Sequence, residues 1–248
     1  MEKRIGRRMT EANDRYQLFG PGDRILVGVS GGKDSYTLLH MLRRCLRLAP
    51  FDFEIVAYHL AQGQPGFPSE KIESYLLSEG YETVIERQNT YQIVVDKLRK
   101  DATPCSLCSR LRRGIMYKAA NRLGCTRIAL GHHREDLIET LLLNLFYAGR
   151  LESMPPKLRN DAGDQVVIRP LAHVPETWIA EFAVEQGFPI APCLFCETGS
   201  RQRRKQMGEL IQTLAQDNPY IQKSIMSAMA NIHPSHLLDG KLFEHRQL

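Results

Sequence analysis

One stretch near the start of the chain, residues 25–35, constrains the fold more than any other. It reads Ile-Leu-Val-Gly-Val-Ser-Gly-Gly-Lys-Asp-Ser, and apolar residues at helical spacing follow it from Leu38 to Leu42. The short, mostly β-branched part at 25–29 predicts a buried strand, and a helix is expected from Asp34 onward. A strand, a glycine turn and a helix in this order direct free backbone N–H groups and the positive end of a helix dipole at one point. The stretch therefore predicts a phosphate-binding loop.

The residue types of the turn suit an anion. Gly31 and Gly32 let the backbone approach closely, and Lys33 adds a cation. Ser30 and Ser35 add hydroxyl donors. The spacing is neither that of the common nucleotide P-loop nor that of the G-x-G-x-x-G dinucleotide fingerprint. An ordinary glycine turn is the alternative, and the strand–turn–helix context favours the phosphate site over it.

The rest of the chain alternates strands with helices. Strands are expected at 25–29, 53–60, 82–86, 126–130 and 166–171. This order favours an α/β fold, Rossmann-like and doubly wound, with a parallel sheet of five strands. We divide the chain into a basic N-terminal helical arm (1–20), a nucleotide-binding α/β domain (21–190), and a C-terminal segment with a cysteine-containing loop and helices (191–248).

The fourth expected strand leads into a second polar motif, Gly-His-His-Arg-Glu-Asp at 131–136. Ligands of open α/β sheets bind outside the carboxyl ends of the strands, where the strand order reverses. If the first and fourth strands are neighbours, this motif faces the glycine turn. Asp136 and Glu139, one helical turn apart, would then lie near a triphosphate, where a carboxylate can hold Mg²⁺. A capped helix start with a solvated acidic face explains the same residues equally well.

The charge and hydropathy of the chain indicate which class of partner and which cellular compartment to expect. The formal charge of +5 is modest, but basic residues cluster at 3–8, 43–47, 110–113 and 201–205. A single cluster is usually a solvated helix face, whereas four together favour nucleic acid. No apolar run approaches the length of a membrane span, and the N-terminus lacks the apolar core of a signal peptide. We therefore expect a cytoplasmic protein that does not bind a membrane.

The six cysteines are then not expected to form structural disulfides, because the cytoplasm is reducing. Four of them form two C-x-x-C pairs, which could converge on one metal site, and spacing alone favours zinc there. The pairs are Cys105 with Cys108 and Cys193 with Cys196. Cys45 and Cys125 stand alone among apolar neighbours, which predicts buried, inert thiols.

Seven segments, taken in order, resemble the tRNA 2-thiocytidine synthetases, a family of PP-loop ATP pyrophosphatases. They are the loop at 30–35, the first cysteine pair with its arginines (105–114), Gly-His-His-Arg-Glu-Asp (131–136), Met-Pro-Pro-Lys (154–157), Ile-Arg-Pro-Leu (168–171), Pro-Cys (192–193) and Pro-Ser-His-Leu (234–237). The resemblance covers nearly the whole chain. It implies an ATP-dependent tRNA sulfurtransferase that adenylates the C2 oxygen of a cytidine in the anticodon loop, at position 32, and replaces this oxygen with sulfur. It also implies Mg²⁺ and a 4Fe-4S cluster held by three cysteines.

The resemblance, read together with the local chemistry, assigns the site residues. The ATP-binding residues are Ser30, Gly31, Gly32, Lys33, Asp34, Ser35, Gly131 and His132. The cluster ligands are Cys105, Cys108 and Cys193, with Cys196 as a fourth ligand, a persulfide carrier or a bystander. The catalytic residues are Lys33, Asp34, Asp136 and Arg112, with Asp136 also binding Mg²⁺. The residues assigned to tRNA are Arg110, Arg112, Arg113, Arg203 and Arg204.

Three thiolates on four irons leave one iron open to an exogenous sulfide, and a sulfur donor such as a cysteine desulfurase is the expected partner. A homodimer is the default expectation for this family. Other PP-loop tRNA modifiers, of the lysidine or 2-thiouridine synthetase type, share the glycine turn, and the two cysteine pairs count against the lysidine type. A non-catalytic, metal-stabilised ATP-binding redox sensor is the alternative from another functional class.

Overall fold

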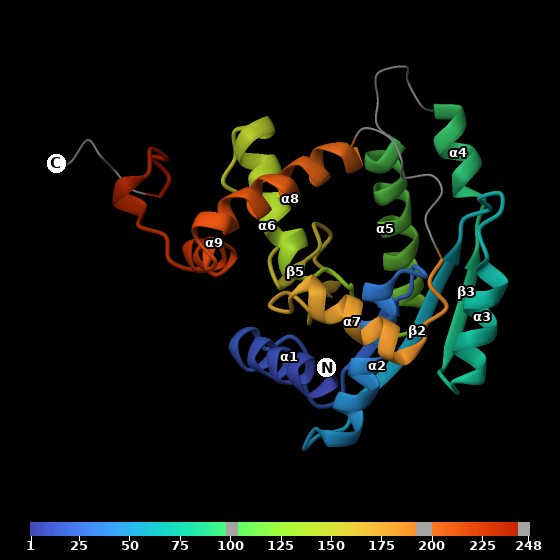
Figure 1. Cartoon of the computed structure of the whole chain (residues 1–248). Coiled ribbons are helices and arrows are strands. Elements are labelled where there is room, and N and C mark those ends of the chain that lie inside the picture. Colours follow the sequence, from blue (N-terminus) through green and yellow to red (C-terminus); the bar gives the residue numbers. More distant parts are fainter. Residues whose placement is uncertain (98–103, 192–199, 243–248) are drawn as a thin grey trace.

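The computed structural model describes residues 1–97, 104–191 and 200–242. This part of the chain forms one sheet in the order β3-β2-β1-β4-β6-β5 (Figure 1). The strands are β1 (Arg24–Gly28), β2 (Glu54–Ala61), β3 (Thr83–Arg87), β4 (Arg127–Ala129), β5 (Lys157–Arg159) and β6 (Val166–Ile168). All neighbours pair in parallel except β5 with β6. The strand order reverses between β1 and β4, so the doubly wound α/β fold is confirmed. The first and fourth strands are neighbours, which is the condition under which the motif at 131–136 faces the glycine turn.

The sheet of the described residues has six strands, so the prediction of five was wrong by one. The additional strand, β5, is three exposed residues within a stretch that the sequence predicts as irregular loop. It pairs antiparallel with β6 across a turn that the N–H of Gly163 closes on the carbonyl of Asn160, at 2.9 Å. A three-residue edge strand is too short to show an alternating pattern, so its sequence carries no strand signal.

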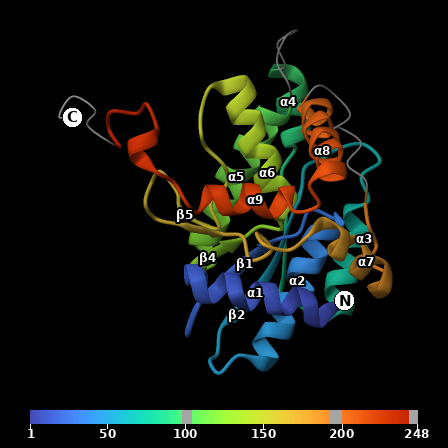
Figure 2. The same ribbon diagram turned by 60° about the vertical axis from the view of Figure 1, so that its left-hand side comes forward.

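Helices cover both faces of the sheet (Figures 1 and 2). The residues of β1 are buried on both sides: Ile25 and Val27 join one core cluster and Leu26 joins the other. This explains its continuous apolar run, which is typical of a central parallel strand. The first cluster is covered by α1 (Glu2–Tyr16), α2 (Lys33–Leu48), α3 (Ser69–Ser78) and α7 (Glu176–Gln186). The second cluster is covered by α5 (Pro104–Arg122).

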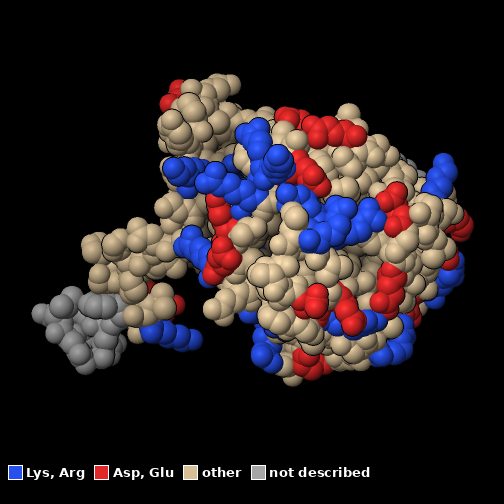
Figure 3. Space-filling model, turned by 90° about the horizontal axis from the view of Figure 1, so that it is seen from below, with Lys and Arg blue, Asp and Glu red and all other residues tan. Residues whose placement is uncertain are grey.

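The helix expected over the N-terminal 20 residues is α1, but it does not extend from the molecule as an arm. Ile5, Met9 and Ala12 are fully or almost fully buried in the first core cluster. Two of its arginines, Arg7 and Arg8, pair with Glu11 of the same helix. Figure 3, which views the lower side of the molecule, shows basic side chains interspersed with acidic ones rather than a surface of one sign.

The remaining elements are α4 (Thr90–Lys97), α6 (Arg134–Leu143), the π-helical turn η1 (Asn144–Ala148), α8 (Ser200–Asp217), α9 (Ile221–Met229) and the 3₁₀ turn η2 (Pro234–His236). Both α8 and α9 pack on α6, and the chain beyond α9 projects away from the body (Figures 1 and 2). None of the helices in the described ranges combines the length and the apolar character that crossing a membrane requires.

Candidate active site

The loop between β1 and α2 has the geometry of an anion-binding cradle. Gly31 has a φ of +86°, in the left-handed region that favours glycine. A Cβ at this position would lie 2.8 Å from Cδ1 of Ile72 and 3.1 Å from Cβ of Ala191, so packing excludes a side chain as well. No side chain caps the start of α2 at Gly32, which leaves backbone N–H groups of the first turn for an anion.

Ser30 and Ser35 hold this loop in shape. The N–H of Ser30 donates to Oγ of Ser35 at 3.2 Å, and the hydroxyl of Ser35 donates to the carbonyl oxygen of Gly32 at 2.9 Å. Ser35 is buried. Its hydroxyl is therefore engaged inside the turn, where it supports the backbone that faces a ligand.

Lys33, at the start of α2, is held by two carboxylates. Its Nζ lies 2.9 Å from Oε1 of Glu176 and 3.1 Å from Oδ1 of Asp34. Burial disfavours the ammonium form, but the two carboxylates outweigh burial and raise the pKa of Lys33. Burial raises the pKa of Asp34, and the charge of Lys33 only partly opposes it. Sequence reasoning missed Glu176, because only the fold brings the start of α7 to the start of α2.

Gly131, after β4, lies directly against this loop. A Cβ on Gly131 would lie 2.9 Å from both the carbonyl carbon and the carbonyl oxygen of Asp34. The contact follows from the parallel pairing of β1 with β4, which brings their carboxyl ends to one edge. The motif at 131–136 therefore lies beside the glycine turn, as expected if the first and fourth strands are neighbours.

We expect Gly131→Ala to lower the free energy of unfolding by about 1–3 kcal/mol, because the new methyl group meets backbone that cannot yield without moving α2. ATP binding will weaken in the same variant. Gly114→Ala is the matched control: Gly114 lies within α5 with open space around its Cα, so alanine should stabilise the protein by up to about 1 kcal/mol. Urea unfolding measures both changes, and equal effects of the two substitutions would contradict the close approach.

His133 connects the start of α6 to the loop. Its backbone N–H donates to Oδ2 of Asp136 at 3.0 Å, and its Nδ1 lies 3.2 Å from Oε2 of Glu135. Its Nε2 lies 3.7 Å from Oδ1 of Asp34. Burial alone would lower the pKa of His133, but these carboxylates raise it. The side chain is 6% exposed, which fits a packed, hydrogen-bonded residue at a strand end.

His132 differs from its neighbour in protonation. Burial and the nearby Arg169 lower the pKa of His132 to about 4, so the ring is neutral at physiological pH. Nε of Arg169 donates to Nδ1 of His132 at 3.2 Å. Because Nδ1 accepts this bond, the proton of the neutral ring resides on Nε2. His132 therefore has one N–H available for a hydrogen bond to a ligand.

Asp136 and Glu139 lie on α6 near the loop, but their surroundings differ. One oxygen of Asp136 accepts the N–H of His133, and the other lies 3.1 Å from Nη1 of Arg204. Arg204, which the sequence assigns to tRNA, thus pairs with the residue assigned to Mg²⁺. No three His, Cys, Asp or Glu side chains of the described residues are grouped closely enough to hold a metal ion. The Mg²⁺ assignment to Asp136 stays a prediction.

The raised pKa of Glu139 predicts that the stability of the fold depends on pH. Burial, which Arg204 only partly offsets, raises the pKa of Glu139 from 4.5 to about 7. Between these values the folded protein keeps a proton that the unfolded chain has lost, so stability decreases as pH rises from 4.5 to about 7. We expect Glu139→Gln to increase the free energy of unfolding at pH 8 by about 1–3 kcal/mol and to change it little near pH 4.5. Denaturant unfolding at both pH values measures this change, and Glu181→Gln, on the exposed side of α7, is the control. If Glu139→Gln increased the free energy of unfolding equally at both pH values, the raised pKa of Glu139 would not be the cause.

The first cysteine pair lies on α5, at the same edge of the sheet as the nucleotide loop. The thiol of Cys108 donates to Oε1 of Gln62 at 3.4 Å, and Gln62 directly follows β2. The side chain of Cys105, and Cys193 and Cys196 altogether, lie outside the described residues. Burial raises the pKa of the thiols of Cys45 and Cys125, which keeps both protonated, as expected of inert cysteines.

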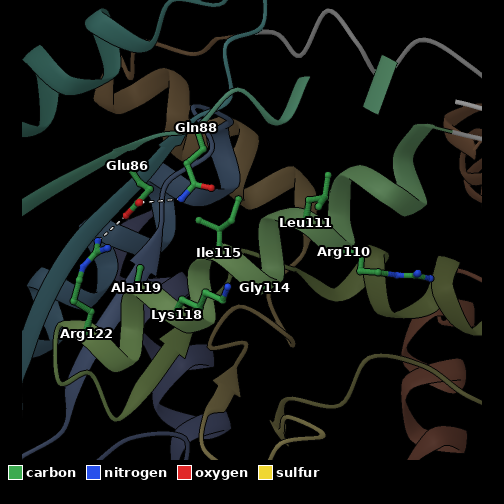
Figure 4. Close-up of a pocket in the computed structure, with 9 residues that line it drawn as sticks. All are labelled: Glu86, Gln88, Arg110, Leu111, Gly114, Ile115, Lys118, Ala119 and Arg122. Atoms are coloured by element: carbon green, nitrogen blue, oxygen red, sulfur yellow. Dashed lines mark hydrogen bonds and ion pairs between the residues drawn. The ribbon is translucent and has the colours of Figure 1, made fainter. Parts of the chain in front are cut away.

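The basic residues assigned to tRNA are distributed around this edge. Arg112 and Arg113 are exposed on α5. A groove of about 310 Å³ runs between α5 and the end of β3, with Leu111 and Ile115 on its wall (Figure 4). Arg110 belongs to its lining, but its side chain extends along the helix away from the groove (Figure 4). On α8, the guanidinium of Arg203 lies 4.9 Å from the centre of the Tyr147 ring.

Comparisons with known proteins agree with this arrangement. Residues 1–190 match the family model described as a PP-loop domain. The chain is 49% identical over 248 residues to the tRNA-cytidine(32) 2-sulfurtransferase of Aromatoleum aromaticum, covering 100% of this chain and 78% of that protein. It is 48% identical over 246 residues to the protein of the same name from Serratia proteamaculans, covering 99% of this chain and 79% of that protein. The solved structure of the U34-tRNA thiolase NcsA from Methanococcus maripaludis, with its 4Fe-4S cluster, superposes with a TM-score of 0.72 at 19% identity, over 94% of this chain and 80% of that chain. That likeness concerns the fold alone.

Proposed function

Since the chain belongs to the PP-loop tRNA-cytidine(32) 2-sulfurtransferases, we propose that it replaces the C2 oxygen of a cytidine in the tRNA anticodon loop with sulfur, in a reaction driven by ATP. One contact supports this most. The backbone N–H of Ala191 donates to the carbonyl oxygen of Gly31 at 2.9 Å. Ala191 is the last described residue before the segment that carries Cys193, so the described chain reaches the nucleotide loop two positions before the third predicted ligand. Cys108 stands at the same edge of the sheet.

The first step activates the base. The C2 oxygen of cytosine attacks the α-phosphate of ATP, a new P–O bond forms, and pyrophosphate leaves. The glycine turn and the first turn of α2 would hold the pyrophosphate, with Lys33 exchanging Glu176 for phosphate oxygens and neutralising the developing charge. The N–H at Nε2 of His132 would donate to the nucleotide.

The carboxylates near Lys33 suit a divalent cation shared with phosphate. Oδ1 of Asp34 is buried and accepts no well-directed hydrogen bond in the described part of the chain, although Nζ of Lys33 lies 3.1 Å from it. Mg²⁺ in nucleotide sites commonly takes one or two carboxylates together with phosphate oxygens. Asp34 and Asp136 would supply these carboxylates, and Mg²⁺ bound there would neutralise charge on the phosphates.

The second step exchanges oxygen for sulfur. A sulfide attacks C2 of the adenylated base, the bond from C2 to oxygen breaks, and AMP leaves with that oxygen. Thiolates are the usual ligands of iron–sulfur clusters, and the half-buried thiol of Cys108 at the nucleotide edge fits such a ligand. Cys105, Cys108 and Cys193 would hold a 4Fe-4S cluster whose remaining iron supplies a soft site for sulfide. Arg112, on the same helix, would contact the RNA or the adenylate.

The decisive experiment is reconstitution. The full chain, loaded anaerobically with iron and sulfide, is incubated with ATP, Mg²⁺ and unmodified tRNA, and the digested RNA is analysed by mass spectrometry. The expected products are 2-thiocytidine, AMP and pyrophosphate. An ATP-binding sensor would release no AMP in response to tRNA, and a lysidine-type enzyme would need an amine and would introduce no sulfur.

We infer two partners, a sulfur donor and a second copy of the chain. A cysteine desulfurase is a suitable sulfur source, because a thiol of the reducing cytoplasm can attack its persulfide, form a disulfide and release the outer sulfur as sulfide. Leu145, Phe146 and Tyr147 on η1 are 41%, 56% and 52% exposed, which supports a homodimer contact at this turn. Light scattering that finds only the mass of one chain would contradict the dimer.

A further inference from the structure

A buried arginine beside the candidate active site lacks the counter-ion that buried charges usually have. Arg169, which follows β6, is 8% exposed. Its Nε donates to Nδ1 of His132 at 3.2 Å and its Nη1 donates to the carbonyl oxygen of Pro155 at 2.6 Å. Both acceptors are neutral, since His132 is uncharged at physiological pH. Among the described residues, Arg169 forms no ion pair with a carboxylate and its Nη2 makes no hydrogen bond.

The groups around Arg169 act in both directions: Arg113 opposes its positive charge, whereas Tyr117 and Asp136 favour it without forming an ion pair with it among the described residues. Arg113, on α5, is close enough for repulsion between the two guanidinium groups to lower the pKa of Arg169 in addition to the larger effect of burial. Arg204, from α8, acts in the same sense on His132. The acid that faces them, Asp136, is already occupied by the N–H of His133 and by Arg204. Arg169 and Arg204 thus both lower the pKa of His132, and the carboxylate of Asp136 opposes them only in part.

Burying an unpaired cation is costly unless something of opposite charge meets it in the working state. The planar guanidinium, with a donor left over, matches the oxygens of a phosphate group. We propose that Arg169 and Arg113 form a second phosphate-binding subsite, which takes a phosphate ester of the RNA strand or of the nucleotide.

This subsite is distinct from the glycine turn. The strands β1, β4 and β6 are successive neighbours, so the end of β6 lies two strand spacings, about 10 Å, from the end of β1. His132 stands between them at the end of β4. A phosphate at Arg169 would therefore fix the substrate on the far side of His132 from the pyrophosphate. The identity of the two candidate ligands rests on the proposed function.

The test measures binding rather than turnover, so it can fail independently of thiolation. Arg169→Gln in the full chain is titrated with an unmodified anticodon stem-loop RNA and, separately, with ATP. If the phosphate belongs to RNA, the RNA Kd rises about tenfold or more, and the slope of log Kd against log salt falls by about 0.7, with the ATP Kd unchanged. If it belongs to the nucleotide, the ATP Kd rises by a similar factor and RNA binding is unchanged. Either result supports the subsite, and unchanged affinity for both ligands overturns it.

Three further variants separate binding from structure. Arg169→Lys keeps the charge and should preserve the salt slope. Arg113→Gln removes an exposed side chain that the fold does not need, so it tests the subsite even if Arg169→Gln unfolds; it should weaken the same ligand. Arg159→Gln is the matched control. This exposed arginine donates to the carbonyl oxygen of Gly163 and lies opposite Val166, at the other end of β6 from Arg169. If Arg159→Gln weakened binding equally, the loss of any positive charge would explain the result, and the subsite would be overturned.

Discussion

Lys33→Met is expected to lower kcat/KM for tRNA thiolation by about 10²- to 10³-fold, the usual effect of removing one group that stabilises charge in a transition state. The side chain is 27% exposed and lies between Glu176 and Asp34, so its loss removes a cation from the nucleotide site without opening a cavity in the core. Release of AMP and pyrophosphate should fall in parallel, because the role proposed for Lys33 belongs to the adenylation step. Both are measured in one assay, by mass spectrometry of the RNA and by chromatography of the nucleotide.

Lys71→Met provides the matched control for this substitution. Lys71 is in the first turn of α3, a helix that also follows a strand of the sheet, and it is exposed to solvent. The Lys71→Met variant should retain thiolation, because Lys71 is not part of the nucleotide loop. Thiolation by Lys33→Met at the rate of the unmodified chain would remove Lys33 from the mechanism, and an equal loss in both variants would point to general charge instead.

Cys108→Ala is expected to abolish thiolation while adenylation continues. The residues proposed for the two steps lie on different elements: Lys33 and the glycine turn follow β1, whereas Cys108 lies on α5 beside Gln62, after β2. Cys108 is a proposed ligand of the cluster, so the absorbance of the reconstituted cluster should fall in this variant. AMP and pyrophosphate should still form when tRNA and ATP are added, since the activated base can be hydrolysed by water.

Cys45→Ala is the control, because it makes the same substitution at a cysteine outside the candidate active site. Cys45 is on α2, where burial raises the pKa of its thiol. Full cluster absorbance and full thiolation are expected from this variant. If Cys108→Ala still made 2-thiocytidine with a normal cluster spectrum, Cys108 would not be a ligand, and the assignment of the cysteine pairs would have to be revised.

The local chemistry of the site could be predicted because it depends on residues close together in the chain. Gly31 is needed for a positive φ within a four-residue turn, and Asp136 caps the backbone of His133 three residues earlier. Such features depend on backbone geometry over one or two turns, which the sequence states directly. The alternation of strands and helices also predicted a parallel sheet, through the rules for crossover connections, but it did not determine that β1 and β4 are neighbours.

The partners of the charged side chains could not be predicted in the same way. Glu176 binds Lys33, Arg204 binds Asp136, and Arg169 binds His132, each across a large separation in the chain. The motif Ile-Arg-Pro-Leu at 168–171 contributed to the family resemblance, but it did not indicate that Arg169 is buried against a histidine. Similarly, the many basic residues of α1 predicted a basic arm. The structure shows instead that three apolar residues of this helix, Ile5, Met9 and Ala12, pack it into the core.

Taken alone, the amino-acid order predicted a phosphate-binding loop at the head of a helix, within a parallel α/β sheet, and paired thiols suited to a metal. Tertiary structure decided which charges meet: it placed Gly131 against Asp34, brought Ala191 to Gly31, and left Arg169 without an ion pair among the described residues. The physical reason is range. Turn geometry and helix capping act between residues a few positions apart, whereas ion pairs and close backbone contacts depend on where the sheet brings distant segments together.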